Sequence, residues 1–176
     1  NVIGGENLVM KTRPAATVDE LVIKQSASLK VALGENPKRV YSSQQKAPRT
    51  RMATAALIRQ TLVAAQNYQR KTDAERDLKL ESVSKAMRRE IRVHAHAHRS
   101  DDIMTALRIA DEFALDLALV HGTEAHKVAS ELAQRGIPVV VGPSLGTRSK
   151  VELKDKTFKT PALLLESGVK VALMTD

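Results

Sequence analysis

The side chains best suited to chemistry are the five histidines, which all lie between residues 94 and 126. His94, His96 and His98 alternate with alanine, so on a β-strand they would point to one face of the sheet. His121 ends the next short apolar run. A lone histidine on a strand is more often a hydrogen-bonded core residue, but three in alternation with a fourth at the next strand end favour a metal site. Imidazole ligands suit a divalent ion of borderline character, and we expect zinc, with manganese or iron as alternatives.

Several charged residues stand near the ends of predicted strands. Asp176 follows the last apolar run and would add a carboxylate to the histidine ligands. Arg99 follows the histidine-bearing strand, where its guanidinium either binds a substrate carboxylate through two hydrogen bonds or pairs with a neighbouring acid. Asp101 and Asp102 are expected to cap a helix rather than to take part in chemistry. Lys30 is expected to be structural.

A repeated strand–helix pattern must position these side chains. Apolar runs that predict strands begin at residues 91, 117, 137 and 169, with predicted helices between them. Spacings of 26, 20 and 32 residues suit parallel βαβ units. We therefore predict an α/β fold, either a doubly wound sheet or part of a (β/α)₈ barrel, in which functional residues gather at the carboxyl ends of the strands. A complete barrel takes about 250 residues, so a chain of 176 would supply only part of one.

The first ninety residues carry weaker patterns. A short strand is predicted over residues 29–33, and a loop over 37–50, where two prolines lie among polar residues. Apolar residues at helical spacing predict helices over 51–70 and 73–89.

The net charge of +8 is concentrated in one part of the chain. Residues 37–99 hold 15 Lys and Arg against 5 Asp and Glu, whereas the rest of the chain holds 13 against 15. A solvated helix face is the simpler interpretation, and a phosphate-binding or subunit-binding patch is the alternative. Only four residues are aromatic, which argues against a stacking platform for single-stranded nucleic acid.

The sequence lacks the features of several other classes of protein. The absence of cysteine excludes disulfides, thiolate zinc sites and a cysteine nucleophile, and it suits a reducing compartment, so we expect a cytoplasmic protein. No apolar run is long enough to cross a membrane. Residues 142–146 (GPSLG) lack the spacing of a phosphate-binding loop, and no nucleophile elbow is present.

Five segments carry motifs of a known family: residues 91–103 (IRVHAHAHRSDDI), 120–124 (VHGTE), 139–143 (VVVGP), 171–176 (VALMTD) and 32–39 (ALGENPKR). Together they resemble the metal-dependent amidohydrolases related to imidazolonepropionase, with the first four matching the fifth to eighth strands of the barrel. The His-Ala-His-Arg and Ser-Asp-Asp combination is the most specific motif. The resemblance covers most of the chain.

The resemblance implies a role for each matching residue. His96 corresponds to the fifth-strand metal ligand, and His98 to a neighbour close to the substrate. His121 corresponds to the sixth-strand histidine, which is either a metal ligand or a hydrogen-bond donor to the substrate. Asp176 matches the eighth-strand aspartate that binds the metal or moves the proton. Lys30 matches a lysine near the fourth strand that is carboxylated in some binuclear relatives.

The activity that the resemblance implies is hydrolysis of a C–N bond in a small molecule, either a cyclic amide or an acyl-amino compound, by a metal-activated water. Asp176 would carry the proton to the leaving nitrogen. His121, with His98 or Arg99, would stabilise the developing oxyanion. Two alternatives stay open: a non-catalytic metal-binding scaffold, and a module whose basic helices bind nucleic acid.

The sequence departs from the family pattern at the first strand. No histidine precedes His94, so the His-x-His pair that supplies two metal ligands is absent, and the chain stops at Asp176, where family members continue. The missing histidine pair, the early stop and the lack of an initiator Met together predict that residues 1–176 are a single catalytic-domain fragment. This fragment would be the C-terminal portion of a partial TIM barrel that lacks the first strands. Open barrel edges favour pairing with another copy, so we expect a homo-oligomer, and little activity from this chain alone.

Overall fold

The computed structural model describes residues 1–176 as one six-stranded sheet with helices between most of the strands. The strands lie in the order β1-β2-β3-β4-β5-β6; β1 is antiparallel to β2, and every later pair is parallel. This confirms the predicted α/β class built from parallel strand–helix units. The elements, with η marking short 3-10 helices, are β1 (Ile3–Met10), β2 (Val22–Ala32), α1 (Glu35–Ser43), α2 (Arg51–Arg70), α3 (Leu78–Met87), β3 (Arg92–Ala97), α4 (Ser100–Phe113), β4 (Leu117–His121), η1 (Ala125–Val128), α5 (Ala129–Gln134), β5 (Val139–Val141), η2 (Val151–Leu153), α6 (Thr160–Glu166) and β6 (Val171–Leu173).

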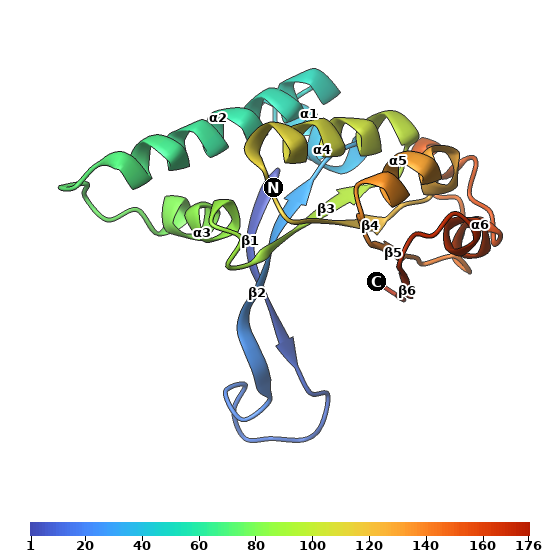
Figure 1. The fold of residues 1–176 in the computed structure, drawn as a ribbon, viewed down its shortest axis with the longest axis horizontal. Helices are drawn as coiled ribbons and strands as arrows, with labels where there is room; N and C mark the ends of the chain where they lie inside the picture. The colour runs from blue at the N-terminus through green and yellow to red at the C-terminus, as the bar shows by residue number, and fades with distance from the viewer.

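The helices gather on one face of the sheet. Figure 1 shows α1, α2 and α4 above the strands, with α5 and α6 following the sheet towards the C-terminus. Leu29 and Val93 of the strands are buried in one core cluster with Ile58 of α2 and Leu107 of α4. Burial of these apolar side chains is the main force that holds the helices on the sheet.

The opposite face of the sheet carries polar groups. Side chains alternate along a strand, so the neighbours of the core residues point away from the helices. Lys30 of β2 lies beside His94 of β3, and Ala32 lies beside His96. Helices on one face and polar side chains on the other agree with part of a (β/α) barrel, whose inner face holds the site.

Each of the four predicted strands starts within two residues of the first residue of β3, β4, β5 or β6. The helix predicted over 51–70 is α2. The Thr50 hydroxyl caps α2 by accepting a hydrogen bond from the Ala53 N–H at 3.1 Å. The helix predicted over 73–89 is shorter, because Asp77 caps α3 by accepting a hydrogen bond from the Lys79 N–H.

Two predictions for the first half of the chain were right only in part, because their bounds were wrong. The loop predicted over 37–50 begins within α1, because Pro37 lies in the first helical turn, where a missing N–H breaks no hydrogen bond. The strand predicted over 29–33 is only the end of the much longer β2. Its antiparallel partner β1 was not predicted at all. Figure 1 shows this hairpin projecting away from the body of the molecule.

Many basic side chains of residues 37–99 pair with acids, which agrees with a solvated helix face. The ion pairs are Arg51–Asp102, Arg59–Glu112, Arg76–Glu81, Lys85–Glu6, Arg88–Glu90, Arg92–Asp116 and Arg99–Asp101. None of the helices combines the length and the apolar character that a membrane span requires.

Candidate metal centre

Three of the predicted histidines meet at the carboxyl edge of the sheet. His96 lies near the end of β3, His98 follows that strand, and His121 ends β4. Their ring centroids are 4.3 to 4.8 Å apart, and one nitrogen from each ring lies within 4.8 Å of the others. All three side chains are buried. His94 lies apart from this cluster, with its Nδ1 3.2 Å from the Ser28 hydroxyl.

The backbone at the end of β4 brings His121 into the cluster. The strand register pairs His121 with Ala97 rather than with His96, so regular alternation would turn its ring towards the helices. His121 instead has a left-handed φ of 76°, which breaks the alternation. Gly122 follows with a φ of 54°, and a Cβ there would lie 2.7 Å from Val139 Cγ1. Glycine is therefore required immediately after the histidine.

Hydrogen bonds outside the cluster orient two of the rings. Nδ1 of His121 donates to the Gly142 carbonyl at 2.7 Å, because a carbonyl oxygen can only accept. Nε2 of His121 is then left with a free lone pair. Nε2 of His96 lies 3.2 Å from the side-chain nitrogen of Asn36. An accepting partner such as the Gly142 carbonyl is the kind that orients a metal-binding histidine, whereas the Asn36 amide nitrogen donates to His96 and occupies its Nε2 lone pair in the metal-free state.

His98 has a different environment. Its Nδ1 lies 2.8 Å from the Thr123 hydroxyl. Its Nε2 is buried without a hydrogen-bond partner, 3.7 Å from the Glu152 carboxylate. Thr123 belongs to the VHGTE motif at residues 120–124, whereas nothing in the sequence singles out Glu152, which stands in a polar connection between elements.

Burial keeps the histidines neutral. It lowers the pKa of His96 to about 2 and that of His98 to about 3, and repulsion from nearby His121 acts in the same direction. Burial also lowers the pKa of His121, although its bond to the Gly142 carbonyl and the Asp176 carboxylate oppose this. Neutral imidazoles present the lone pairs that bind a cation.

A cavity of about 520 Å³ opens over the cluster. Asp176 lines it together with the three histidines, so the structure brings every predicted metal ligand to one place. Lys30 was expected to be structural, but it also lines this cavity, as does Lys150. Burial lowers the pKa of Lys30, and the Asp176 carboxylate opposes that shift.

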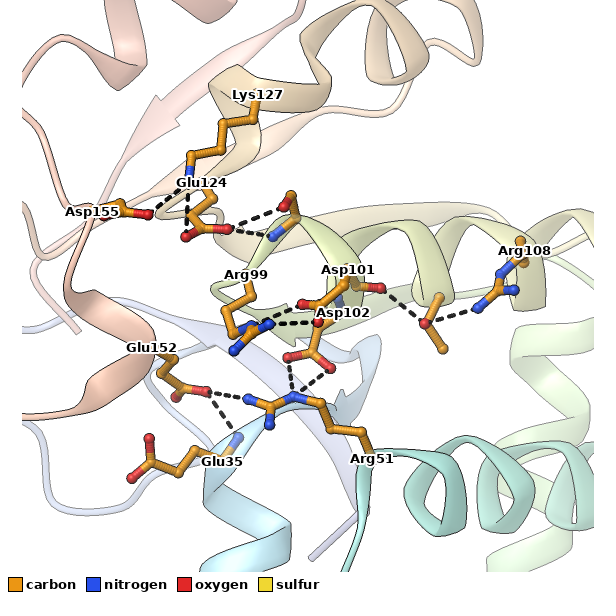
Figure 2. Close-up of polar contacts among 12 residues, drawn as sticks. Glu35, Arg51, Arg99, Asp101, Asp102, Arg108, Glu124, Lys127, Glu152 and Asp155 are labelled. Carbon is orange, nitrogen blue, oxygen red and sulfur yellow. Dashed lines mark hydrogen bonds and ion pairs between the residues drawn. The ribbon is translucent and has the colours of Figure 1, made fainter.

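Arg99 lies outside the cavity lining. Its guanidinium donates two hydrogen bonds to Asp101, at 2.9 and 2.8 Å (Figure 2). Of the two uses predicted for Arg99, the structure shows pairing with a neighbouring acid and gives no support to substrate binding. The N-cap of α4 makes no side-chain hydrogen bond, so the capping role expected of Asp102 is not seen; Asp102 is instead buried and accepts hydrogen bonds from the Arg51 guanidinium at 2.9 and 3.2 Å.

Two known proteins resemble this chain. An amidohydrolase from Thermotoga maritima MSB8, whose crystal structure is solved, is 47% identical with a TM-score of 0.95, and the match covers 99% of this chain and 48% of that chain. The amidohydrolase tasK of Hapsidospora irregularis is 26% identical over 156 residues, which is 73% of this chain and 16% of that protein. No family model matches the sequence. The chain therefore spans less than half the length of either relative, and both likenesses support an amidohydrolase family.

The cluster fits a divalent ion. Of its three neutral imidazoles, His96 and His121 offer nitrogens within 4.8 Å of each other, and two nitrogens bound to one tetrahedral zinc lie about 3.4 Å apart, so a modest ring movement separates the two arrangements. Asp176, which lines the same cavity, would add a carboxylate oxygen to these donors. Amidohydrolases commonly use divalent metals, and this histidine cluster could hold one.

Proposed function

We propose that the chain is the metal-binding portion of an amidohydrolase catalytic domain, of the branch related to imidazolonepropionase, that hydrolyses a C–N bond in a cyclic amide or a small acyl-amino compound. The observation that carries this proposal is the cluster of three buried, neutral histidines beside an aspartate at the carboxyl edge of a parallel sheet. The likeness to two amidohydrolases supports it.

His96, His121 and Asp176 would hold the ion, for which we propose zinc. When bound, it supplies Lewis-acid activation of water. Because Nδ1 of His121 already donates to a carbonyl, Nε2 has no proton to donate to substrate, which favours the ligand role over the oxyanion role. Asp176 would hold the proton at its carboxylate and pass it to the leaving nitrogen. Lys150, which lines the cavity, is better placed than Arg99 to stabilise negative charge on the substrate.

We further propose that residues outside this segment supply the remaining strands and the first-strand ligands. The chain covers 48% of the Thermotoga chain, and none of its histidines precedes His94. If the segment acts alone, the open edge at β6, where Leu173 is exposed, is where a second copy would pair. The absence of cysteine supports a reducing, cytoplasmic setting.

Turnover by the complete catalytic domain tests the proposal. The zinc-loaded domain is expected to hydrolyse at least one member of a panel of lactams, cyclic imides and N-acyl amino acids. Asp176→Asn is expected to lower kcat by about 100-fold or more, the usual range for a lost general acid or base. Asp155→Asn, which removes an exposed carboxylate outside the cavity lining, is the control and should keep full turnover.

Full turnover by Asp176→Asn would refute its role in proton transfer. A domain that binds zinc but hydrolyses nothing in the panel would instead support the non-catalytic scaffold.

A further inference from the structure

Glu152 is a buried carboxylate with one oxygen left unpaired. It lies in η2, in the connection between β5 and α6 that lines one side of the cavity. Only 1% of its side chain is exposed. Oε2 accepts a hydrogen bond from the Glu35 N–H at 2.8 Å and lies 3.8 Å from the Arg51 guanidinium (Figure 2). Oε1 has no hydrogen-bond partner.

The nitrogen that faces Oε1 is Nε2 of His98, and it too is buried without a partner. The two atoms are 3.7 Å apart, which is slightly longer than a hydrogen bond. Leaving both atoms unpaired is unfavourable in a buried setting, and a small rotation of the imidazole would join them.

The surrounding groups decide which atom donates. Arg51 bonds to Asp102 through Nε, and its Nη2 lies 3.8 Å from Oε2 of Glu152, so neither nitrogen donates to Oε1. A carboxylate only accepts, and a hydroxyl can donate or accept. With its proton on Nε2, His98 donates to Glu152 and accepts from Thr123, so that every one of these atoms is satisfied.

We propose that Glu152 is a positioning residue: its Oε1 accepts a hydrogen bond from the Nε2–H of His98, so that His98 braces the other two histidines without itself binding the ion. Its ring lies edge-on to His96 at 4.8 Å and tilted against His121 at 4.6 Å. The statement about the ion rests on the proposed function, whereas the proton on Nε2 does not depend on it.

The same carboxylate ties the cavity-lining connection to the turn between β2 and α1. Gly34 in that turn has a φ of 82°, and a Cβ there would lie 2.8 Å from Glu152 Oε2. The backbone can therefore approach the carboxylate closely enough for the Glu35 N–H to donate to it. Glu152 thus links the position of His98 to the position of Lys150, two residues earlier in the same connection.

The position of the His98 proton is measured by ¹⁵N NMR of the histidine side chains in chelator-treated protein at pH 7. The His98 signals are assigned by their loss in His98→Gln. In the wild type we expect a protonated Nε2 and an unprotonated Nδ1. In Glu152→Gln the amide oxygen must stay on the Glu35 N–H, so its NH₂ group faces His98, and the proton is expected to move to Nδ1 with Thr123 as acceptor.

Asp155→Asn is the matched control, because Asp155 anchors the same connection through Lys127 at 2.7 Å without contacting His98 (Figure 2). This variant should keep the proton on Nε2. Should Glu152→Gln fail to fold, Thr123→Val removes the other partner and should also leave the proton on Nε2. A proton on Nδ1 in the wild type, or an unmoved proton in folded Glu152→Gln, would overturn the proposal.

Zinc content separates this inference from the proposed function. His98→Gln is expected to keep the bound zinc that His96→Gln loses, and loss of zinc from a folded His98→Gln would overturn the bracing role. If the wild type binds no zinc but carries the His98 proton on Nε2, the proposed function fails while the role of Glu152 stands.

Discussion

Acid is expected to destabilise the metal-free protein, because its histidine cluster is buried in the neutral state. Burial holds the pKa of His96 at about 2 and that of His98 at about 3, whereas histidines titrate near 6.5 in an unfolded chain. As the pH falls through 6.5 the unfolded state therefore binds protons that the folded state does not. The stability due to these neutral rings is fully present above pH 6.5 and is lost progressively as the pH falls towards their folded pKa values.

The size of the effect follows from proton linkage. Between pH 7 and pH 5 each of the two histidines lowers the free energy of unfolding by about 2 kcal/mol, or about 4 kcal/mol together, for any folded pKa well below 5. The lowered pKa of His121 adds to this loss. Burial raises the pKa of Asp102 and Glu152, so these groups act in the opposite direction and stabilise the fold as the pH falls through their folded values. A loss of about 4 kcal/mol is a large part of the 5–15 kcal/mol typical of a domain.

Urea unfolding at pH 7, 6 and 5 in EDTA, followed by circular dichroism, measures this loss. His96→Gln is expected to lose about 2 kcal/mol less than the wild type between pH 7 and pH 5, since it lacks one of the buried rings that resist protonation in the folded state. His126→Gln, outside the cluster, is the control and should follow the wild type. A His96→Gln variant with the same pH dependence as the wild type would refute the reasoning.

Three other predictions concern stability. Gly142→Ala should destabilise the fold by about 3 kcal/mol or more in urea unfolding, because Gly142 has a φ of 144° and a Cβ there would lie 2.1 Å from the Met174 carbonyl oxygen. Gly146→Ala, with no atom within 4 Å of its new Cβ, should cost less than about 1 kcal/mol, and equal losses would contradict the packing argument. Arg51→Met should cost about 3–5 kcal/mol because it leaves buried carboxylates without their cation, whereas the exposed Arg59→Met should cost at most about 1 kcal/mol. Zinc at about 100 times its Kd should raise the free energy of unfolding by about 3 kcal/mol, as thermal melts with and without EDTA would show, and an unchanged melting temperature would contradict specific binding to the folded state.

The second half of the fold could be predicted because its strands are short apolar runs separated by clear helix signals. Residues 117–120 and 139–141 are uninterrupted apolar runs, and Gly136 marks the end of the helix between them. The β1–β2 hairpin has no such signal, since its outer part is exposed and a connection of eleven residues joins its strands. The apolar residues of the outer part of the hairpin therefore do not alternate regularly with polar ones, which is the pattern that would have predicted its strands.

The site could be predicted only where neighbours in sequence are also neighbours in space. Alternation along one strand was enough to group His96 with His98. The left-handed φ that brings in His121 leaves no mark in the sequence beyond the glycine that follows. Glu152 contacts Glu35 across 117 positions, and only the folded chain shows that such distant segments meet.

Metal content per chain tests the central claim most directly. The protein is treated with a chelator, reloaded with zinc, dialysed and measured by elemental analysis, beside His96→Gln, His121→Gln and the matched control His94→Gln. We predict about one zinc per chain in the wild type and in His94→Gln, and much less in the other two variants. No zinc in the wild type, or equal zinc in all four proteins, would contradict the account of the histidine cluster as a metal centre.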